Sequence, residues 1–177
     1  MTAPHLYYFD RNEFEREDKH GNPINWFDQM NPRLLVILDV LRFNWSEYRG
    51  EDSPIILSPA AGALGRQLGE ESMSDHNIDR WKTVNGVDAM PAGLKTREDA
   101  NVFRLLARDA TVNALGLYPD WEIRPGQPSP GLHIGVRAHR KPGDLAVWGA
   151  VDAPDPATGR VVQTYTTWDA ALERMPL

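Results

Sequence analysis

Hydrophobic residues recur at helical spacing in the segment that follows Asn31 and Pro32. Asparagine is a favoured N-cap residue and proline a favoured first helical residue, so the start of the segment is marked as well. The apolar positions continue to about Tyr48 and lie on one face of a helix. The pattern therefore predicts a helix over residues 31–48, with apolar positions at Leu34, Leu35, Leu38 and Leu41.

A second helical pattern begins at Thr96, where Asp99 three residues later can complete a capping box. Apolar residues then recur at helical spacing, and glycine is the residue that most often follows the end of a helix. We expect this helix to include Ala114 and to end at Gly116. Its apolar positions are Ala100, Phe103, Leu106, Ala107, Ala110 and Ala114.

Shorter apolar runs between turn residues predict strands. They cover residues 54–58, 132–138, 145–150 and 161–167, and the last leads into a short terminal helix. The glycine-rich residues 60–69 form a loop or a broken helix, and the proline- and glycine-rich residues 118–131 form a loop. The expected fold class is α+β, as a single domain with a small antiparallel sheet, helices packed on one face and a metal site in a groove on the other.

Residues 1–30 lack a clean period and are expected to form an arm that packs on the body formed by residues 31–177. The aromatic residues of this arm are the candidates for that packing. They are Tyr7, Tyr8, Phe9, Phe14, Trp26 and Phe27.

Composition narrows the classes of partner. The 177 residues suit one domain, and 19 basic against 25 acidic residues give a net charge of −6. This charge disfavours nucleic acid and anionic membrane as partners. No basic, apolar leader begins the chain and no run is long enough to span a membrane, so we expect folding in the cytoplasm of the producing cell. The chain has no cysteine, so any metal must be held by histidine and carboxylate ligands.

The candidate chemistry lies in three short segments. Around His133, apolar residues alternate with His133 and Arg137, so a strand there would present both side chains to a groove. Asp88 lies between apolar Val87 and Ala89 and would project to the same side from a neighbouring strand. His76 would come from a preceding loop. Two imidazoles and a carboxylate can hold zinc and leave one position open, although each residue taken singly is more often a core histidine or a turn acid.

Ser74, two residues before His76, is close enough in the sequence to hydrogen-bond either a ligand or the loop backbone. We expect it to support the metal site in this way.

The three segments together resemble the zinc metallopeptidase family of D-alanyl-D-alanine carboxypeptidases and L-alanyl-D-glutamate endopeptidases, especially its small phage-encoded members. A Ser-x-His element corresponds to Ser74 and His76, a small-x-Asp strand to Gly86 and Asp88, and the last ligand strand to His133. The resemblance implies a Zn²⁺ ion held by His76, Asp88 and His133. It also implies hydrolysis of the peptide stem of bacterial peptidoglycan, at a D-Ala-D-Ala or an L-Ala-D-Glu bond.

The sequence departs from the family in three ways, namely an insertion, missing acids and a missing arginine. An insertion that contains Trp81 and Lys82 separates His76 from Asp88. Pro130 stands where many members carry an acid before the last ligand, and Gly135 stands where close relatives carry an aspartate after it. The third departure is that no arginine follows Ser58 directly to bind a substrate carboxylate.

Candidates for the missing roles lie nearby. Asp120, with Glu122 second, is the candidate acid or base that carries the proton to the leaving amine, unless Asp120 is only a turn residue after proline. Arg66 is the candidate for the substrate carboxylate, unless it is a solvated loop cation.

Two functions follow. The first is a peptidase that cleaves the peptidoglycan stem, is phage-encoded, and acts on the wall after lysis or as part of a virion. The second is a virion-associated structural protein that keeps the fold but has lost catalysis, and whose partners are other virion proteins. The departures at Pro130 and Gly135 motivate the second.

Overall fold

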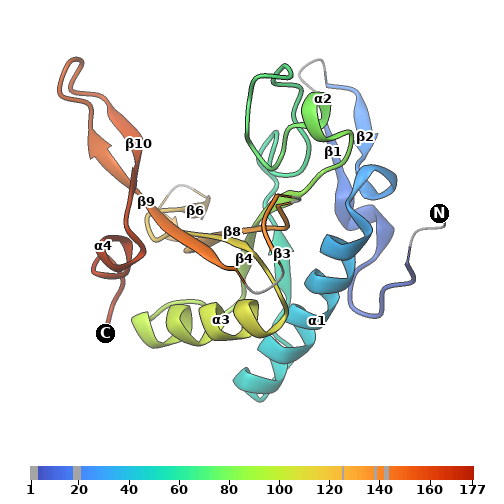
Figure 1. The fold of residues 1–177 in the computed structure, drawn as a ribbon. Coiled ribbons are helices and arrows are strands. Elements are labelled where there is room, and N and C mark those ends of the chain that lie inside the picture. Colours follow the sequence, from blue (N-terminus) through green and yellow to red (C-terminus); the bar gives the residue numbers. More distant parts are fainter. Residues whose placement is uncertain (1–3, 18–20, 125, 138, 142–143) are drawn as a thin grey trace.

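We describe a computed structural model of the chain over residues 4–17, 21–124, 126–137, 139–141 and 144–177. The fold is α+β, as predicted, and its centre is a sheet with strand order β10-β9-β5-β8-β4-β3 (Figure 1). The bounds of these strands are β3 Ile55–Leu57, β4 Gly86–Pro91, β5 Ala114–Tyr118, β8 Gly131–Gly135, β9 Ala146–Pro154 and β10 Val161–Thr166. Neighbouring strands are antiparallel except β5 and β9, which are parallel, so the sheet is mixed rather than wholly antiparallel.

Helices and two small hairpins complete the described fold. The helices are α1 Pro32–Arg49, α2 Ile78–Trp81, α3 Arg97–Asp109 and α4 Trp168–Leu172, with 3-10 turns η1 Arg11–Phe14 and η2 Phe27–Gln29. The hairpins pair β1 Glu15–Glu17 with β2 Pro23–Asn25, and β6 Glu122–Arg124 with β7 Gln127–Pro128. No helix within the described ranges has both the length and the apolar character needed to cross a membrane.

The first predicted helix is confirmed by α1. The Asn31 side chain accepts a hydrogen bond from the Arg33 amide at 3.0 Å, and Gly50 ends the helix in the left-handed conformation with φ of 68°. Both features use residues suited to them, because asparagine caps well and glycine adopts positive φ without strain. The buried side of α1 carries Leu34, Leu35, Ile37, Leu38, Leu41 and Trp45.

The second predicted helix begins as expected and ends earlier than expected. Thr96 and Asp99 form a capping box at the start of α3, but the helix stops at Asp109. The prediction that it includes Ala114 and ends at Gly116 is wrong, since both residues lie in β5. Thr111, with φ of 64°, turns the chain between the two elements.

The N-terminal residues contribute to the main core only in part. Phe9, Phe14, Trp26 and Phe27 are buried in the same cluster as the inner side of α1. Tyr7, in contrast, is 84% exposed and does not pack as expected, whereas the ring of Tyr8, 39% exposed, lies 5.9 Å from the ring of Phe43 in α1.

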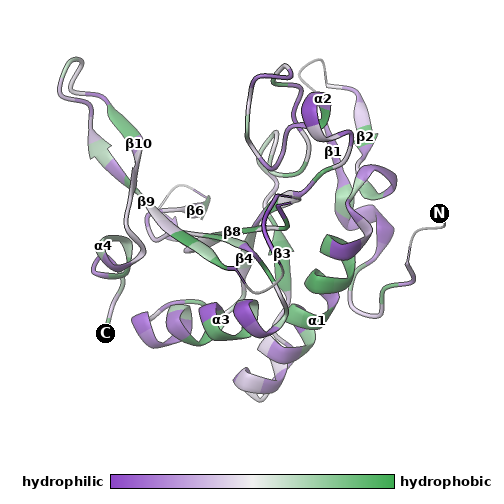
Figure 2. Ribbon diagram, in the orientation of Figure 1, coloured by the Kyte–Doolittle hydropathy of each residue, from purple (hydrophilic) through white to green (hydrophobic). Residues whose placement is uncertain are grey.

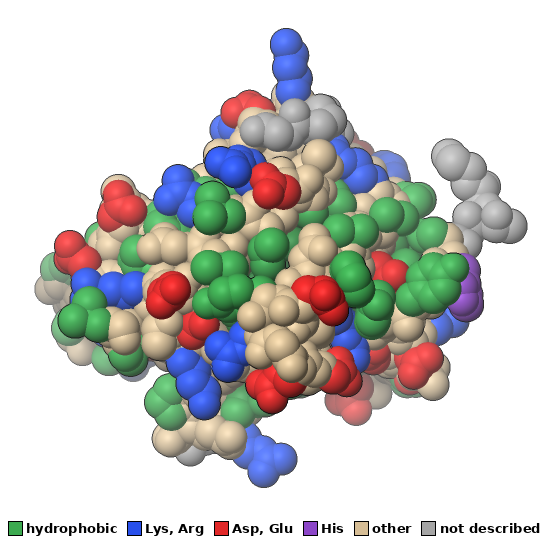
Figure 3. All heavy atoms as spheres, turned by 90° about the horizontal axis from the view of Figure 1, so that it is seen from below, with side chains coloured by type: hydrophobic (Ala, Val, Ile, Leu, Met, Phe, Trp, Pro, Cys, Tyr) green, Lys and Arg blue, Asp and Glu red, His purple; other side chains and the backbone are tan. Residues whose placement is uncertain are grey.

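The sheet has one face for the core and one for the candidate site. In β5, Leu115 and Leu117 point into the core, and Leu132 and Ile134 do so in β8. α3 and α4 both contact β5, and α1 contacts α3, so the helices cover this face. Both long helices mix hydrophobic and hydrophilic residues, as expected for helices with one buried side (Figure 2). Seen from the helix side, the surface intersperses hydrophobic side chains with charges of both signs (Figure 3).

Candidate metal centre

The sheet register places the site residues in one row. Asp88 of β4 lies opposite His133 of β8, His133 opposite Gly116 of β5, and Gly116 opposite Trp148 of β9. Because side chains alternate along a strand, residues opposite one another in register point to the same face. Asp88, His133 and Trp148 therefore project together from the face that the helices leave uncovered.

The third ligand comes from a loop that is fixed at several points. The Arg66 amide donates to the His76 carbonyl oxygen at 2.8 Å, and the Ile78 amide donates to the Arg66 carbonyl oxygen at 3.0 Å. The Ser74 hydroxyl accepts from the His76 amide at 3.3 Å, so Ser74 supports the loop backbone as anticipated. The inserted segment is ordered by α2, and the Trp81 indole donates to the Ser74 carbonyl oxygen at 2.9 Å.

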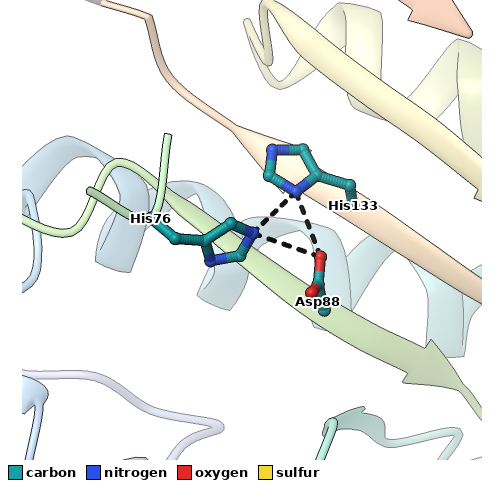
Figure 4. Close-up of side chains that lie close together, drawn as sticks. All are labelled: His76, Asp88 and His133. Atoms are coloured by element: carbon teal, nitrogen blue, oxygen red, sulfur yellow. Dashed lines mark hydrogen bonds and ion pairs between the residues drawn. The ribbon is translucent and has the colours of Figure 1, made fainter. Parts of the chain in front are cut away.

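His76, Asp88 and His133 meet in a triangle of donor atoms (Figure 4). His76 Nε2 lies 3.1 Å from His133 Nδ1, and the Asp88 Oδ1 atom lies 3.3 Å from the former and 3.1 Å from the latter. A tetrahedral zinc ion with ligand distances of about 2.05 Å has ligand atoms about 3.3 Å apart. The triangle thus fits three ligands of one metal ion. All three residues are buried.

Each imidazole is oriented by the nitrogen that does not face the triangle. His76 Nδ1 lies 2.7 Å from the Leu64 carbonyl oxygen, an acceptor, so this nitrogen carries the proton and leaves Nε2 free to bind. His133 Nε2 lies 3.2 Å from the Asp75 Oδ2 atom, which leaves Nδ1 free. Partners of this kind fix the tautomer and the ring direction of metal-binding histidines.

Asp75 belongs to the candidate site, and sequence reasoning missed it. Its carboxylate is 3% exposed and accepts from Arg137 Nε at 2.9 Å as well as from His133. Its position directly before His76 was the only local signal. A Cβ built on Gly135 would lie 3.0 Å from His133 Nε2 and 3.2 Å from the Asp75 Oδ2 atom. Asp75 therefore occupies the space that an aspartate side chain at position 135 would enter.

The pKa values of the buried acids and of His133 reflect their burial together with their hydrogen bonds and neighbouring charges. Burial alone would raise the pKa of Asp88, but hydrogen bonds from His133 and His76 hold that pKa well below its usual range. The pKa of Asp75 is lowered in the same way, since the hydrogen bond from His133 and the charge of Arg137 outweigh its burial. Burial would lower the pKa of His133, yet its hydrogen bonds to both carboxylates raise it to about 9.

The triad lies in a cleft of about 440 Å³, within the size range of small-ligand sites. Its lining combines ionic and aromatic side chains, namely Arg66, Ser74, Asp75, His76, Asp88, Tyr118, Trp121, His133, Arg137, Trp148, Gln163 and Tyr165. Arg66 lies at the edge of the triad, with Nη2 3.8 Å from the Asp88 Oδ2 atom. Arg137 passes over the Trp148 ring at 5.2 Å.

Asp120 is not brought to the cleft. Its carboxylate accepts from the Asp152 amide at 2.9 Å and pairs with Arg174 at 3.0 Å, and it is not among the residues that line the cavity. Glu122 is also outside the lining and accepts from the Gly126 amide at 3.0 Å. A catalytic role of Asp120 stays a prediction, and the contacts described here give its carboxylate a bridging role between β9 and the end of α4.

Comparison of the chain with models of protein families, with curated protein sequences and with solved structures finds no match. What the structure shows is a buried His-Asp-His triad that could hold a metal ion.

Proposed function

We propose that the protein is a zinc-dependent peptidase that cleaves the peptide stem of bacterial peptidoglycan, and that it is phage-encoded. The observation that carries this proposal is the donor triangle of His76, Asp88 and His133 at the base of an open cleft. The sequence around these residues resembles one family of wall peptidases, and the folded chain brings the same three residues together.

Zinc is the metal that the donor set favours. Two imidazole nitrogens and one carboxylate oxygen make a common three-ligand zinc set in hydrolases, with a fourth position left for water or substrate. When bound, zinc would activate a water molecule near neutral pH and polarise a peptide carbonyl. The triad lines a cleft of about 440 Å³, which leaves room beside it for water or part of a substrate.

The residues around the triad have separable tasks in this proposal. Asp75 holds the His133 ring in its binding tautomer, and Arg137 neutralises Asp75. Arg66, with 43% of its side chain exposed, is close enough to the triad to pair with a carboxylate of the stem peptide. Arginine suits that task because its planar guanidinium binds carboxylates in a two-pronged manner.

One observation favours a second function. Among the described residues that line the cleft, the carboxylates are Asp75 and Asp88, and both are already engaged by histidines. No additional carboxylate in that set is free to carry a proton. This favours a virion-associated structural protein that keeps the metal site without catalysis, with other virion proteins as its partners.

The two functions are separated by product analysis. Zinc-loaded protein is incubated with purified muropeptides and the products are identified by mass spectrometry. The peptidase proposal expects either loss of the terminal D-Ala or cleavage of the stem between L-Ala and D-Glu. This activity should be abolished in His133→Ala and retained in His5→Ala, a matched control at an exposed histidine. One zinc per chain without cleavage of any wall type would favour the structural protein.

A further inference from the structure

The cleft has two ends of different chemistry. The metal end is ionic, with Arg66, Arg137 and the two carboxylates around the imidazoles. The other end carries aromatic and amide side chains that are uncharged at neutral pH. These residues are Tyr118, Trp121, Trp148, Gln163 and Tyr165. The uncharged end meets the ionic end at Trp148, whose ring lies 5.3 Å from the His133 ring and 5.2 Å from the Arg137 guanidinium.

The hairpin of β9 and β10, which projects from the body of the sheet (Figure 1), contributes Trp148, Gln163 and Tyr165 to the uncharged end. Tyr118 is the last residue of β5, and Trp121 follows it in the chain. Tyr165 lies opposite Ala150, and Gln163 lies opposite Asp152. Alternation along the strands puts Gln163 and Tyr165 on the same face as Trp148. Asp152 does not line the cleft, so the hairpin contributes no charge to it.

The aromatic side chains of the uncharged end differ in packing and exposure. The rings of Tyr118 and Trp121 stack at 4.2 Å with an interplanar angle of 7°, and Tyr118 is buried. Trp121 fills the space above Gly131, where a Cβ would lie 2.0 Å from the ring. Tyr165, in contrast, is 72% exposed and leaves its ring available at the rim of the cleft.

We propose that this end of the cleft is a saccharide subsite, which binds the sugar that carries the stem peptide. The proposal rests on the proposed function. A stem peptide bears carboxylates and amines, which suit the ionic end, whereas the N-acetylated sugar is uncharged. Aromatic rings offer apolar faces against which the carbon-bound hydrogens of a sugar ring can pack. The Gln163 amide and the Tyr165 hydroxyl can donate to and accept from sugar hydroxyl and acetamido groups.

The subsite predicts a preference among substrates. Zinc-loaded protein is assayed with a free stem pentapeptide, which contains both the L-Ala-D-Glu and the D-Ala-D-Ala bond, and with the same peptide attached to its disaccharide. We expect kcat/KM to be at least about tenfold higher for the attached peptide, and Tyr165→Ala to reduce this ratio at least about fivefold, mainly through KM. Thr164→Ala is the matched control, because Thr164 lies next in the same strand on the opposite face.

The saccharide subsite can also be tested by measuring binding, which does not depend on peptidase activity. An uncharged N-acetylglucosamine disaccharide is titrated into the wild type, Tyr165→Ala and Thr164→Ala by calorimetry. We expect binding that Tyr165→Ala weakens at least about fivefold and Thr164→Ala leaves unchanged. Disaccharide binding without any peptide cleavage would support the subsite and reject the peptidase.

Equal cleavage of free and attached peptide, with no effect of Tyr165→Ala, would overturn the subsite and leave the peptidase intact. Absence of both cleavage and disaccharide binding would overturn both. The two proposals therefore fail in different ways.

Discussion

Replacement of Asp75 by asparagine tests whether Asp75 orients His133 for metal binding at the triad. The Asp75 carboxylate accepts from His133 Nε2 at 3.2 Å and from Arg137 Nε at 2.9 Å, and it is almost wholly buried. Asparagine keeps the shape of the side chain but removes the charge that holds the imidazole and balances Arg137. None of the three donor atoms of the triangle is lost.

The expected loss follows from the role of such partners. Mutation of a residue that orients a metal-binding histidine typically lowers metal affinity about 10- to 100-fold, which corresponds to about 1.4–2.7 kcal/mol. The unbalanced Arg137 cation beside the site acts in the same direction. Asp88→Asn, which alters a ligand itself, should weaken binding more than Asp75→Asn does.

Zinc affinity is measured by competition with a chromophoric chelator as a function of pH at fixed ionic strength, and the affinities compared are those for the deprotonated His133, because loss of the Asp75 hydrogen bond also removes one cause of the raised pKa of His133. Asp109→Asn is the matched control, since Asp109 is an exposed acid at the end of α3. A thermal melting curve of each variant without metal establishes whether that variant is folded. An affinity of folded Asp75→Asn within about twofold of wild type would refute the orienting role.

Four further outcomes are expected. Metal binding at pH 7 should release at least about one proton, because the pKa of His133 is raised to about 9 without metal and binding needs its deprotonated Nδ1. The apparent affinity should then rise at least about tenfold per pH unit up to about pH 9. Calorimetry in buffers of different ionisation enthalpy measures the release, and a result of no release would contradict this prediction. Removal of zinc by a chelator should lower the melting temperature of the protein, since a ligand at 100 times its Kd stabilises the folded state by about 2.7 kcal/mol. An unchanged melting curve would indicate that the triad does not bind zinc. Gly116→Ala should destabilise by about 1–3 kcal/mol in denaturant titrations, because its Cβ would lie 2.6 Å from the Trp148 ring; a neutral effect would show that Trp148 moves freely. Asp120→Ala should leave the zinc affinity unchanged. If Asp120 is the proton carrier, Asp120→Ala should also reduce the peptidase rate about 10²–10⁴-fold, whereas Asp88→Ala should abolish the activity.

The elements that could be predicted are those with a local signal. α1 carries an apolar period, an asparagine cap and a terminal glycine, and each is visible within a few residues. The pairing of Asp88 with His133 on neighbouring strands was likewise anticipated from alternation around each residue, and it is confirmed by their direct register.

The error at β5 has a physical cause. Ala114 continues the helical period of α3 and alanine favours helices, so the local pattern extended the helix. The competing signal, Leu115 and Leu117 alternating with Gly116 and Tyr118, covers only a few residues. Pairing with β8 and β9 decides in favour of the strand, and those contacts are not local.

Asp75 could not be assigned from the sequence for a related reason. Its partners His133 and Arg137 lie 58 and 62 positions away, so the carboxylate is explained only by the folded sheet. The resemblance led instead to position 135, where glycine stands. The parallel pairing of β5 with β9 is of the same kind, because it depends on a crossover rather than on a turn.

The distance between the ligands along the chain also has a kinetic consequence. His76 and His133 are 57 positions apart, and Asp88 and His133 are 45 apart. The donor triangle therefore exists only after β4 has paired with β8, and a metal ion finds no complete site before that step. Contacts absent from the transition state act on unfolding rather than on folding. We expect zinc to leave the refolding rate nearly unchanged and to lower the unfolding rate. The ion would then stabilise the sheet only after the sheet has assembled.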